Sequence, residues 1–271
     1  MNSFSIFATI FLNILFCSQN YMQIRVDYVS DDDIALFQNA GIDIDHAIYQ
    51  EGRHIEFAIS EYDVEKLINL GYSYHIIHED LESFYVSRLT DNYTREFGLG
   101  SMGGYYTLDE AVQRLDDIQF EYPGFVSEKI SIGTTFQGRD IWAIKITNNS
   151  SDAQNKPQVL YTGMHHAREP MSFMNLYYFI YWLLENYEND SDASYILDNR
   201  ELWFIPIVNP DGYEYNRLIA PNGGGMQRKN MRDTCGGGVD GVDPNRNYSY
   251  QWGLDNQGSS SDGCDETYRG S

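Results

Sequence analysis

Residues 157–187 read PQVLYTGMHHAREPMSFMNLYYFIYWLLENY, and residues 201–208 read ELWFIPIV. The segment from Pro157 to Tyr161 has the pattern of a buried strand. The segment from about Pro170 to Tyr187 is apolar nearly all round, which is typical of a buried helix. The segment 201–208 is a second core strand. A strand, a helix and a strand in this order predict a parallel α/β sheet covered on both faces.

Patterns upstream of this stretch extend the same unit. Thr107-Leu108-Asp109-Glu110 is a capping box that opens a helix running to about Phe120. Two strands are expected next, from Ser127 to Ile132 and from Ile141 to Ile146, joined through a turn that contains glycine. We therefore expect an α/β unit over residues 105–271, with a mixed, mostly parallel sheet and helices on both faces.

The residues before this unit predict a separate small domain. Six short elements are expected in the order β-α-β-β-α-β, which is the ferredoxin-like arrangement. The expected strands are a first one from Gln23, then Ala47–Gln50, His54–Ile59 and Tyr72–Ile77, and the expected helices are Asp31–Ala40 and Glu61–Leu70. We therefore expect an α+β domain over residues 21–85.

Two segments without such patterning flank this domain. The apolar run from Phe4 to Cys17 is shorter than the ~20 residues that a membrane-spanning helix needs, and it fits a secretory signal peptide over residues 1–20. Residues 86–104 are rich in glycine and predict a linker. Arg88 and Arg95 make this linker a candidate site for a trypsin-like activating protease, and the alternative is an ordinary solvated loop.

Charge and cysteine content narrow the function classes. Forty Asp and Glu residues against 18 Lys and Arg give a net charge of −22, which argues against nucleic acid and anionic membranes as partners. Removal of a signal peptide would also remove Cys17 and leave Cys235 and Cys264. In a secreted chain such an even pair suggests a disulfide, and two unpaired buried thiols are the alternative.

The turn after the first buried strand carries the residues best suited to chemistry. In an open α/β sheet, ligands bind where strands end. His166 and Glu169 are three residues apart, so they can face one metal ion. An imidazole and a carboxylate suit Zn²⁺, which in hydrolytic sites takes three protein ligands and leaves one position for water. Taken alone, such a pair is weak support, because satisfied surface pairs are common.

Three further polar clusters accompany this pair. Asn209-Pro210-Asp211-Gly212 is expected to form a turn at the end of the second core strand. Arg228 to Arg232 is a basic cluster in an acidic chain. Asp243 to Tyr248 places Arg246 between two amides, where it is suited to hold a carboxylate. Each cluster alone could be a solvated loop, but cationic groups beside a candidate metal pair favour a functional site.

Together these clusters resemble the secreted zinc carboxypeptidases of the carboxypeptidase A/B type. The resemblance runs from about Tyr105 to the last residue and implies a carboxypeptidase-like fold. Residues 21 to about 85 look like the activation propeptide of that family. The matching runs are His-x-x-Glu at 166–169, Asn-Pro-Asp-Gly at 209–212, Arg-Lys-Asn at 228–230, Val-Asp-x-Asn-Arg-Asn at 242–247 and Cys-x-Glu-Thr-Tyr-x-Gly at 264–270.

The resemblance implies roles for individual residues. His166 and Glu169 match the first two zinc ligands, and His165 is a neighbour rather than a ligand. Arg168 matches a substrate-binding arginine, and Asn245 with Arg246 matches the pair that binds the terminal carboxylate of the substrate.

The arginine that polarises the scissile carbonyl is less clearly matched. Arg232 is the preferred match and requires one inserted residue, Met231, so Arg228 remains a competitor. Cys235 and Cys264 match a disulfide known in the family.

Two functional groups of the family are not matched. Its third zinc ligand, a histidine, and its general base, a glutamate, come further toward the C-terminus, whereas no histidine follows Glu169 here. We therefore expect a C-terminally incomplete chain that binds zinc poorly, through two ligands, and turns over no substrate by itself.

The resemblance implies a secreted zymogen that, when complete, removes C-terminal residues from peptides and proteins with a free C-terminus. An activating protease would cut the linker. The alternatives are a related zinc deacylase and a catalytically inert fragment or pseudoenzyme.

Overall fold

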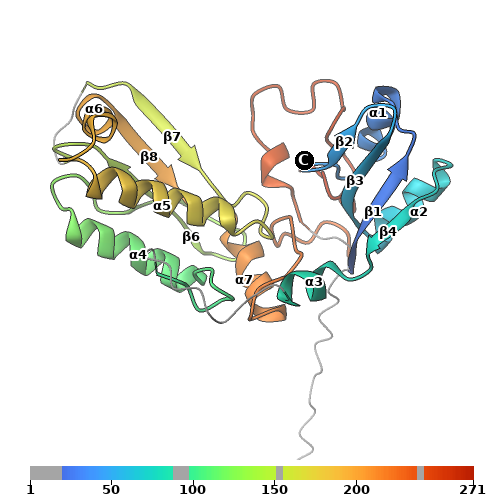
Figure 1. The fold of residues 1–271 in the computed structure, drawn as a ribbon, viewed down its shortest axis with the longest axis horizontal. Coiled ribbons are helices and arrows are strands. Elements are labelled where there is room, and N and C mark those ends of the chain that lie inside the picture. The colour runs from blue at the N-terminus through green and yellow to red at the C-terminus, as the bar shows by residue number, and fades with distance from the viewer. Residues whose placement is uncertain (1–19, 88–97, 151–154, 237–240) are drawn as a thin grey trace, which may run out of the picture.

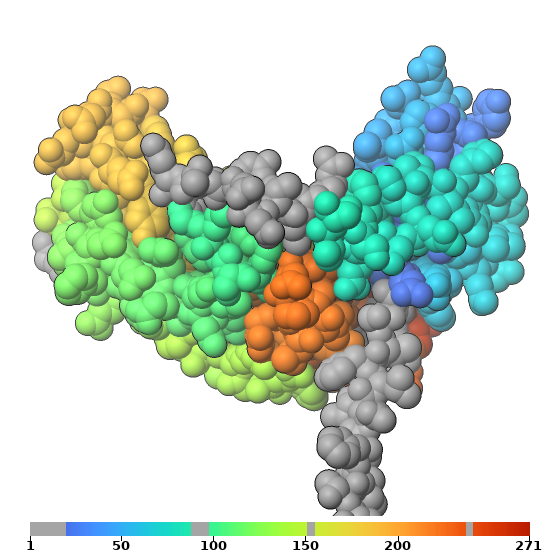
Figure 2. All heavy atoms as spheres, turned by 60° about the horizontal axis from the view of Figure 1, so that its bottom comes forward, coloured from blue at the N-terminus to red at the C-terminus, as the bar shows by residue number. Residues whose placement is uncertain are grey.

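The computed structural model of the chain describes residues 20–87, 98–150, 155–236 and 241–271. The expected signal peptide lies outside the described residues except for its last position. Figure 1 shows two units, each with its own sheet, and the segment near the C-terminus lies beside the first unit. In the space-filling view of Figure 2, the orange residues of the α7 region lie between the green α4 region and the teal residues of the α3 region.

The first unit has six elements around a four-stranded antiparallel sheet in the order β2-β3-β1-β4. Their order along the chain is the one expected from the sequence. The elements are β1 (Tyr21–Asp27), α1 (Asp31–Asn39), β2 (Ile48–Gln50), β3 (His54–Ser60), α2 (Glu61–Asn69) and β4 (His75–His78).

The local sequence explains these elements. Ile24 and Val26 alternate with more exposed residues along β1, and they pack with Phe37 of α1 and Leu67 of α2 in a shared core. Ser60 begins α2 by accepting a hydrogen bond from the amide of Asp63 at 3.1 Å.

A third helix, α3 (Leu81–Ser87), follows this unit, although the expected boundary between domain and linker falls inside it. Asp80 begins the helix by accepting from the amide of Ser83 at 2.9 Å. Leu81 is buried against Tyr21 of β1 and against Met226 of the second unit. This tertiary contact holds the helix where the sequence shows no clear periodicity.

The second unit contains a four-stranded sheet in the order β5-β6-β8-β7. Its elements are α4 (Leu108–Glu121), β5 (Ile130–Thr134), β6 (Asp140–Ile146), β7 (Gln158–Thr162), α5 (Met171–Glu185), α6 (Ser191–Asn199), β8 (Glu201–Ile205), α7 (Pro210–Ile219) and the short 3₁₀ helix η1 (Pro244–Arg246).

The sheet is mixed, as expected, and β7 runs parallel to β8 as the strand–helix–strand pattern predicts. The balance of directions differs from the expectation, because β5 with β6 and β6 with β8 pair antiparallel. A short turn at residues 135–139 joins β5 to β6, and so short a connection permits only an antiparallel pair.

The core of the second unit lies between the sheet and helices α4 and α5, which stand in front of it in Figure 1. Phe204 of β8 stacks on Tyr161 of β7, and Tyr177 of α5 donates to the carbonyl of Ala111 at 2.6 Å. The opposite face of the sheet is partly open in the described residues, since Leu160 is 61% exposed.

Two helices of the second unit were also not expected. Helix α6 begins at Asp190, whose carboxylate accepts from the amides of Asp192 and Ala193. Helix α7 begins at Asn209, so the Asn-Pro-Asp-Gly run is a helix start and not only a turn. The Asn209 side chain accepts from the amide of Gly212 at 3.0 Å, and Pro210 is favoured in a first helical turn.

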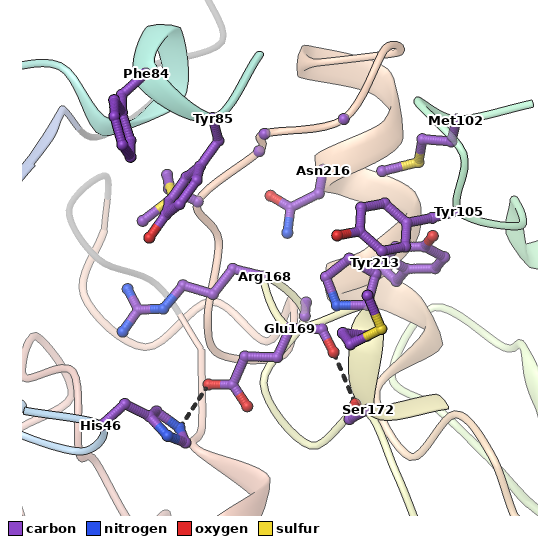
Figure 3. A pocket seen from close by; sticks show the side chains of 17 residues that line it. His46, Phe84, Tyr85, Met102, Tyr105, Arg168, Glu169, Ser172, Tyr213 and Asn216 are labelled. Atoms are coloured by element: carbon purple, nitrogen blue, oxygen red, sulfur yellow. Dashed lines mark hydrogen bonds and ion pairs between the residues drawn. The ribbon is translucent and has the colours of Figure 1, made fainter. Parts of the chain in front are cut away.

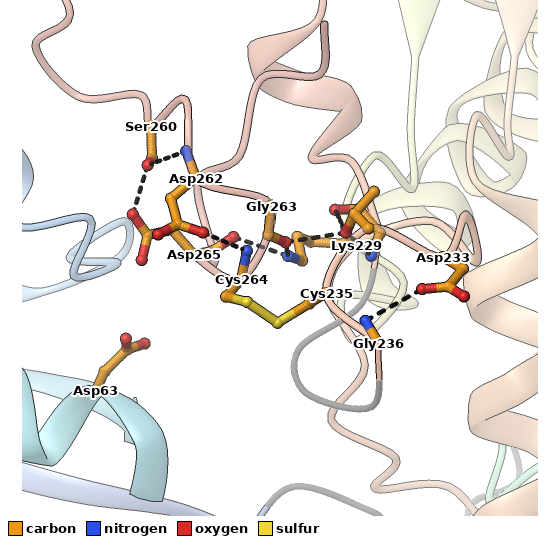
Figure 4. The surroundings of a disulfide bond; sticks show 12 residues. Asp63, Lys229, Asp233, Cys235, Gly236, Ser260, Asp262, Gly263, Cys264 and Asp265 are labelled. Carbon is orange, nitrogen blue, oxygen red and sulfur yellow. Dashed lines mark hydrogen bonds between the residues drawn. A yellow bond between two sulfur atoms is a disulfide. The ribbon is translucent and has the colours of Figure 1, made fainter.

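The expected disulfide between Cys235 and Cys264 is present, with the two Cα atoms 4.9 Å apart (Figure 4). It joins the loop after the basic cluster to the segment near the C-terminus. Lys229 is buried beside it and donates to the carbonyls of Gly263 and Asp265 at 3.2 and 2.8 Å. These bonds fix the loops that carry the candidate site. No described helix has the length and apolar character that would let it cross a bilayer.

Candidate metal and carboxylate-binding site

The candidate site lies at the carboxyl ends of β7 and β8. The loop 163–170 leaves β7 there, and α7 begins beside it. Asn209 ties both to the basic cluster, because its side-chain amide donates to the carbonyls of His165 at 3.1 Å and Arg228 at 3.2 Å. The amide of Ala167 also donates to the Arg228 carbonyl, at 3.0 Å. Three chain segments that are distant in sequence therefore share one hydrogen-bonded junction.

His166 and Glu169 face each other as expected. The ring Nδ1 of His166 lies 2.8 Å from Oε1 of Glu169. The other ring nitrogen, Nε2, lies 3.3 Å from Oδ1 of the buried Asp243 without hydrogen-bond geometry. His165 points elsewhere, with its Nε2 2.6 Å from the Tyr248 hydroxyl. The structure thus brings together the two residues expected to bind zinc.

Neighbouring charges favour the charged forms of His166 and Glu169. Burial alone would lower the pKa of His166, but Asp243 and Glu169 outweigh burial and raise it. Burial would raise the pKa of Asp243, but His166 and Arg228 hold that pKa well below its usual range. The pKa of Glu169 is likewise lowered, because its contact with His166 outweighs the effect of burial. The carboxylates are therefore ionised and suited to a cation.

A third candidate ligand comes from the first unit. His46 precedes β2, and its Nε2 lies 3.2 Å from Glu169 Oε1 (Figure 3). One ligand atom from each of His46, His166 and Glu169 can be chosen so that all lie within 4.8 Å of one another. Two histidines and a glutamate form a ligand set found in catalytic zinc sites, so the donor chemistry fits zinc. The expectation of two ligands did not include His46, which the structure places beside them.

Sequence reasoning missed His46 because it lies in the other predicted domain, far from the His-x-x-Glu run. The only signal was indirect: His46 is one of six histidines in the chain, and none follows Glu169. Only the docking of the two units brings it to the site.

Arg228 is the most buried cation of the site. Its guanidinium donates to Asp43 at 2.6 Å, to Asp45 at 2.9 Å and to Asp243 at 2.8 Å, and its side chain is 0% exposed. Burial would lower the pKa of Arg228, but Asp43 and Asp243 outweigh it, so the guanidinium stays charged.

Arg168 and Arg246 complete an arginine cluster with Arg228. Arg168 donates to Asp43 at 2.7 Å, and Arg246 donates to Asp45 at 2.7 Å and to the Gly258 carbonyl at 2.7 Å. Two carboxylates of the first unit thus bind all three arginines.

Asn245 and Arg232, the other two predicted site residues, are exposed. Asn245 is exposed on η1, and its backbone amide donates to Asp243 Oδ1 at 2.8 Å. Arg232 is exposed, and its backbone amide donates to Asn230 Oδ1 at 3.2 Å. The structure therefore brings Arg228, and not Arg232, into contact with the residues around His166.

A cavity of about 560 Å³ opens beside Glu169 and Arg168. In Figure 3, Tyr85 and Phe84 of α3 lie on one side of it, and Tyr105 and Met102 lie on the other. The glycine run 223–225 also lines it. The cavity is thus enclosed jointly by α3 and the second unit.

Comparison with known proteins agrees with this arrangement. Residues 111–271, more than half of the chain, match the family described as zinc carboxypeptidase. The chain belongs to this family. The family match contains His166, Glu169 and all three arginines of the cluster.

Individual relatives agree with the family match. The zinc carboxypeptidase of Saccharothrix mutabilis subsp. capreolus is 37% identical over 161 residues, which are 59% of this chain and 36% of that protein. Carboxypeptidase A1 of Rattus norvegicus is 36% identical over 167 residues, or 61% of this chain and 37% of the rat protein. This chain thus spans about a third of the length of both relatives.

A solved structure supports the fold of nearly the whole chain. The crystal structure of carboxypeptidase A from Helicoverpa armigera superposes with a TM-score of 0.69 at 23% identity, covering 94% of this chain and 63% of that one. The carboxypeptidase-like α/β fold expected from the sequence is confirmed.

Proposed function

We propose that this chain is the zymogen form of a zinc carboxypeptidase, whose complete catalytic unit removes C-terminal residues from peptides and proteins. The observation that carries the proposal is the arginine cluster beside His166 and Glu169. Arg168, Arg228 and Arg246 each bind a carboxylate of the first unit, Asp43 or Asp45. A site that collects carboxylates beside a metal pair is suited to the free end of a peptide.

Each cation has a proposed role. Arg246, with Asn245, binds the terminal carboxylate of the substrate, and Arg168 binds the peptide beside the metal pair. We assign Arg228 rather than Arg232 to the scissile carbonyl, because its guanidinium already contacts Asp243, the carboxylate beside His166. A fixed guanidinium there stabilises the charge that develops on the carbonyl oxygen.

His166 and Glu169 would hold the zinc ion. When bound, zinc polarises a carbonyl and activates water. The Asp243 carboxylate would orient the His166 ring. It lies beside Nε2 of that ring and so leaves Nδ1 directed at the metal.

The first unit would act as the activation propeptide over residues 21–85. Its Asp43 and Asp45 occupy the arginines that a substrate carboxylate needs, so docking of this unit and substrate binding exclude each other. A protease that cuts the linker 86–104 would release it, and Arg88 and Arg95 in that linker lie outside the described residues. A secreted, extracellular protein with a signal peptide fits this scheme.

A binding experiment with this chain tests the proposal. In the double variant Asp43→Asn and Asp45→Asn the arginines lose the carboxylate partners that the first unit supplies. We expect the variant to bind an N-acetylated peptide with a free C-terminus about 10–100-fold more tightly than the amidated peptide, since a charged hydrogen-bonded pair contributes about 1.5–3 kcal/mol. The added change Arg246→Ala should abolish this preference. Equal affinity for both peptides would contradict the proposal.

The same peptides separate the remaining alternatives. Because no histidine follows Glu169, we expect these 271 residues to bind the free peptide without measurable hydrolysis. Equal cleavage of free and amidated peptides would indicate a zinc deacylase. Strong, chelator-sensitive release of C-terminal residues from this chain alone would contradict the expected lack of turnover.

A further inference from the structure

We propose that His46 of the first unit is a metal ligand that completes, with His166 and Glu169, a three-residue site for a zinc-type divalent cation. In this arrangement the ion would bridge the two units. The propeptide would then be held by coordination as well as by the ion pairs of Asp43 and Asp45.

Two distances between candidate ligand atoms are close to those expected in a zinc site. His166 Nδ1 and His46 Nε2 lie 2.8 and 3.2 Å from the same oxygen, Oε1 of Glu169. Tetrahedral zinc with ligand bonds of about 2.0–2.1 Å sets its ligand atoms about 3.3 Å apart. These two separations are close to that value, and all three candidate ligand atoms lie within 4.8 Å of one another.

The loop that carries His46 is held in place on its N-terminal side. Asp43 binds Arg168 and Arg228, and Asp45 binds Arg228 and Arg246. Asp43 also accepts from the amide of Asp45 at 2.9 Å, which tightens the turn. His46 follows directly, with a φ of 63° that turns the chain toward β2. The carboxylates beside His46 thus fix its position relative to Glu169.

The surroundings suit a cation despite the nearby arginines. Asp43, Asp45 and Asp243 pair with the three guanidinium groups of this cluster. The Glu169 carboxylate contacts the two histidines instead. The Asp243 carboxylate lies beside Nε2 of His166, which leaves Nδ1 for the metal. The His46 side chain is 71% exposed, so water can reach a fourth position on the ion.

Metal titration of the metal-free chain tests the proposal without any catalytic assay. Zn²⁺ affinity is measured by calorimetry, and Co²⁺ is added in parallel because its visible absorption reports the ligand set and geometry. For His46→Ala we expect at least about a tenfold loss of Zn²⁺ affinity, since even partners that only support a ligand contribute 10–100-fold. The Co²⁺ spectrum should lose intensity in the same variant.

The matched control is His75→Ala. His75 is also a histidine of the first unit, and its side chain is 76% exposed, but it pairs with Asp27 and lies outside the metal-ligand cluster. Its removal should leave Zn²⁺ affinity and the Co²⁺ spectrum unchanged. Far-UV circular dichroism of both variants confirms that they fold. A zinc-dependent rise in the unfolding midpoint should be large in the control and reduced in His46→Ala.

The outcomes separate this inference from the proposed function. If the unaltered chain binds Zn²⁺ and His46→Ala binds it equally well, the inference is overturned, whereas the His166–Glu169 pair stands. If His166→Ala also leaves the affinity unchanged, the bound ion lies elsewhere and the metal site of the proposed function fails too. An unaltered chain that binds no Zn²⁺ overturns the bridging site directly.

Discussion

The guanidinium of Arg228 donates to the carboxylate of Asp43 across 2.6 Å, and this pair joins the two units at the candidate site. Both side chains are nearly or fully buried, with exposed fractions of 0% and 6%. Buried charges are tolerated only when they are paired and hydrogen-bonded. Each unit therefore supplies the oppositely charged partner that the buried side chain of the other unit requires. When the first unit docks, its carboxylates therefore also become the hydrogen-bonded partners of the arginine cluster.

Replacement of Arg228 by alanine should destabilise the chain strongly. The change leaves Asp243 and Asp43 buried without their main partner, and breaking a buried ion pair from one side costs about 3–5 kcal/mol. Urea denaturation measures the loss as a lower free energy of unfolding. Arg232→Ala is the control and should change the free energy of unfolding by no more than about 0.5 kcal/mol, because its side chain is exposed. The same loss in both variants would contradict the assignment of Arg228 to the cluster.

Acid should weaken the contact between the units through Asp45. Burial would raise the pKa of Asp45, but Arg228 and Arg246 outweigh burial and lower it from its ordinary value of 3.8. The folded state thus binds fewer protons than the unfolded state near this pH. The stabilisation by ionised Asp45 is fully present above pH 3.8 and is lost as the pH falls through the lower folded-state pKa.

The variant Asp45→Asn measures this contribution. Its unfolding midpoint in urea should lie below that of the unaltered chain at pH 5, and the difference should shrink as the pH approaches 2.5. Asp255→Asn serves as the control, because Asp255 is exposed and an amide oxygen can still accept from Gln257. A difference that is constant with pH would show that ionisation of Asp45 contributes nothing.

Much of the fold and of the candidate site could be predicted from sequence, because short-range patterns of residues determine them. The run that ends in Glu169 lies in the turn after a buried strand, and the spacing of three residues predicted that His166 and Glu169 face each other. The capping box at Thr107 is an equally local signal. The disulfide was expected for another reason, because removal of a signal peptide leaves only Cys235 and Cys264.

What escaped prediction depends on contacts between distant segments. His46 contacts Glu169, and Arg228 contacts Asp43, only where the two units meet, and no spacing in the sequence records those contacts. The preference for Arg232 came from aligning one motif with an inserted residue. Burial, which sequence does not report, favours Arg228.

Removal of the disulfide should destabilise the second unit. Cys235 and Cys264 are separated by 29 positions, and closing a loop of this size contributes about 3–4 kcal/mol in the chain-entropy account. The double variant Cys235→Ser and Cys264→Ser should lower the free energy of unfolding by about this amount. Reduction of the unaltered chain should have a similar effect, and reduction of the double variant should have none. A double variant as stable as the oxidised chain would show that the bond does not constrain these loops.

Gly212 allows the three segments of the site junction to approach one another. A Cβ at this position would lie 2.6 Å from the Lys229 carbonyl oxygen, 2.8 Å from Ala167 Cβ and 2.9 Å from Asn209 Nδ2. Two of these neighbours belong to the loops that hold His166 and Arg228, so any added atom must push those loops apart.

Gly212→Ala should therefore lower the free energy of unfolding by about 1–3 kcal/mol, the usual cost of adding a methyl group to a packed site. It should also weaken Zn²⁺ binding, because the loop from Gly163 to Pro170 carries two of the candidate ligands. Gly124→Ala is the matched control, since a Cβ there meets no atom within 4 Å, and its stability should stay the same or rise slightly. If both glycine variants lose stability equally, the effect reflects backbone freedom and not the packing of the site.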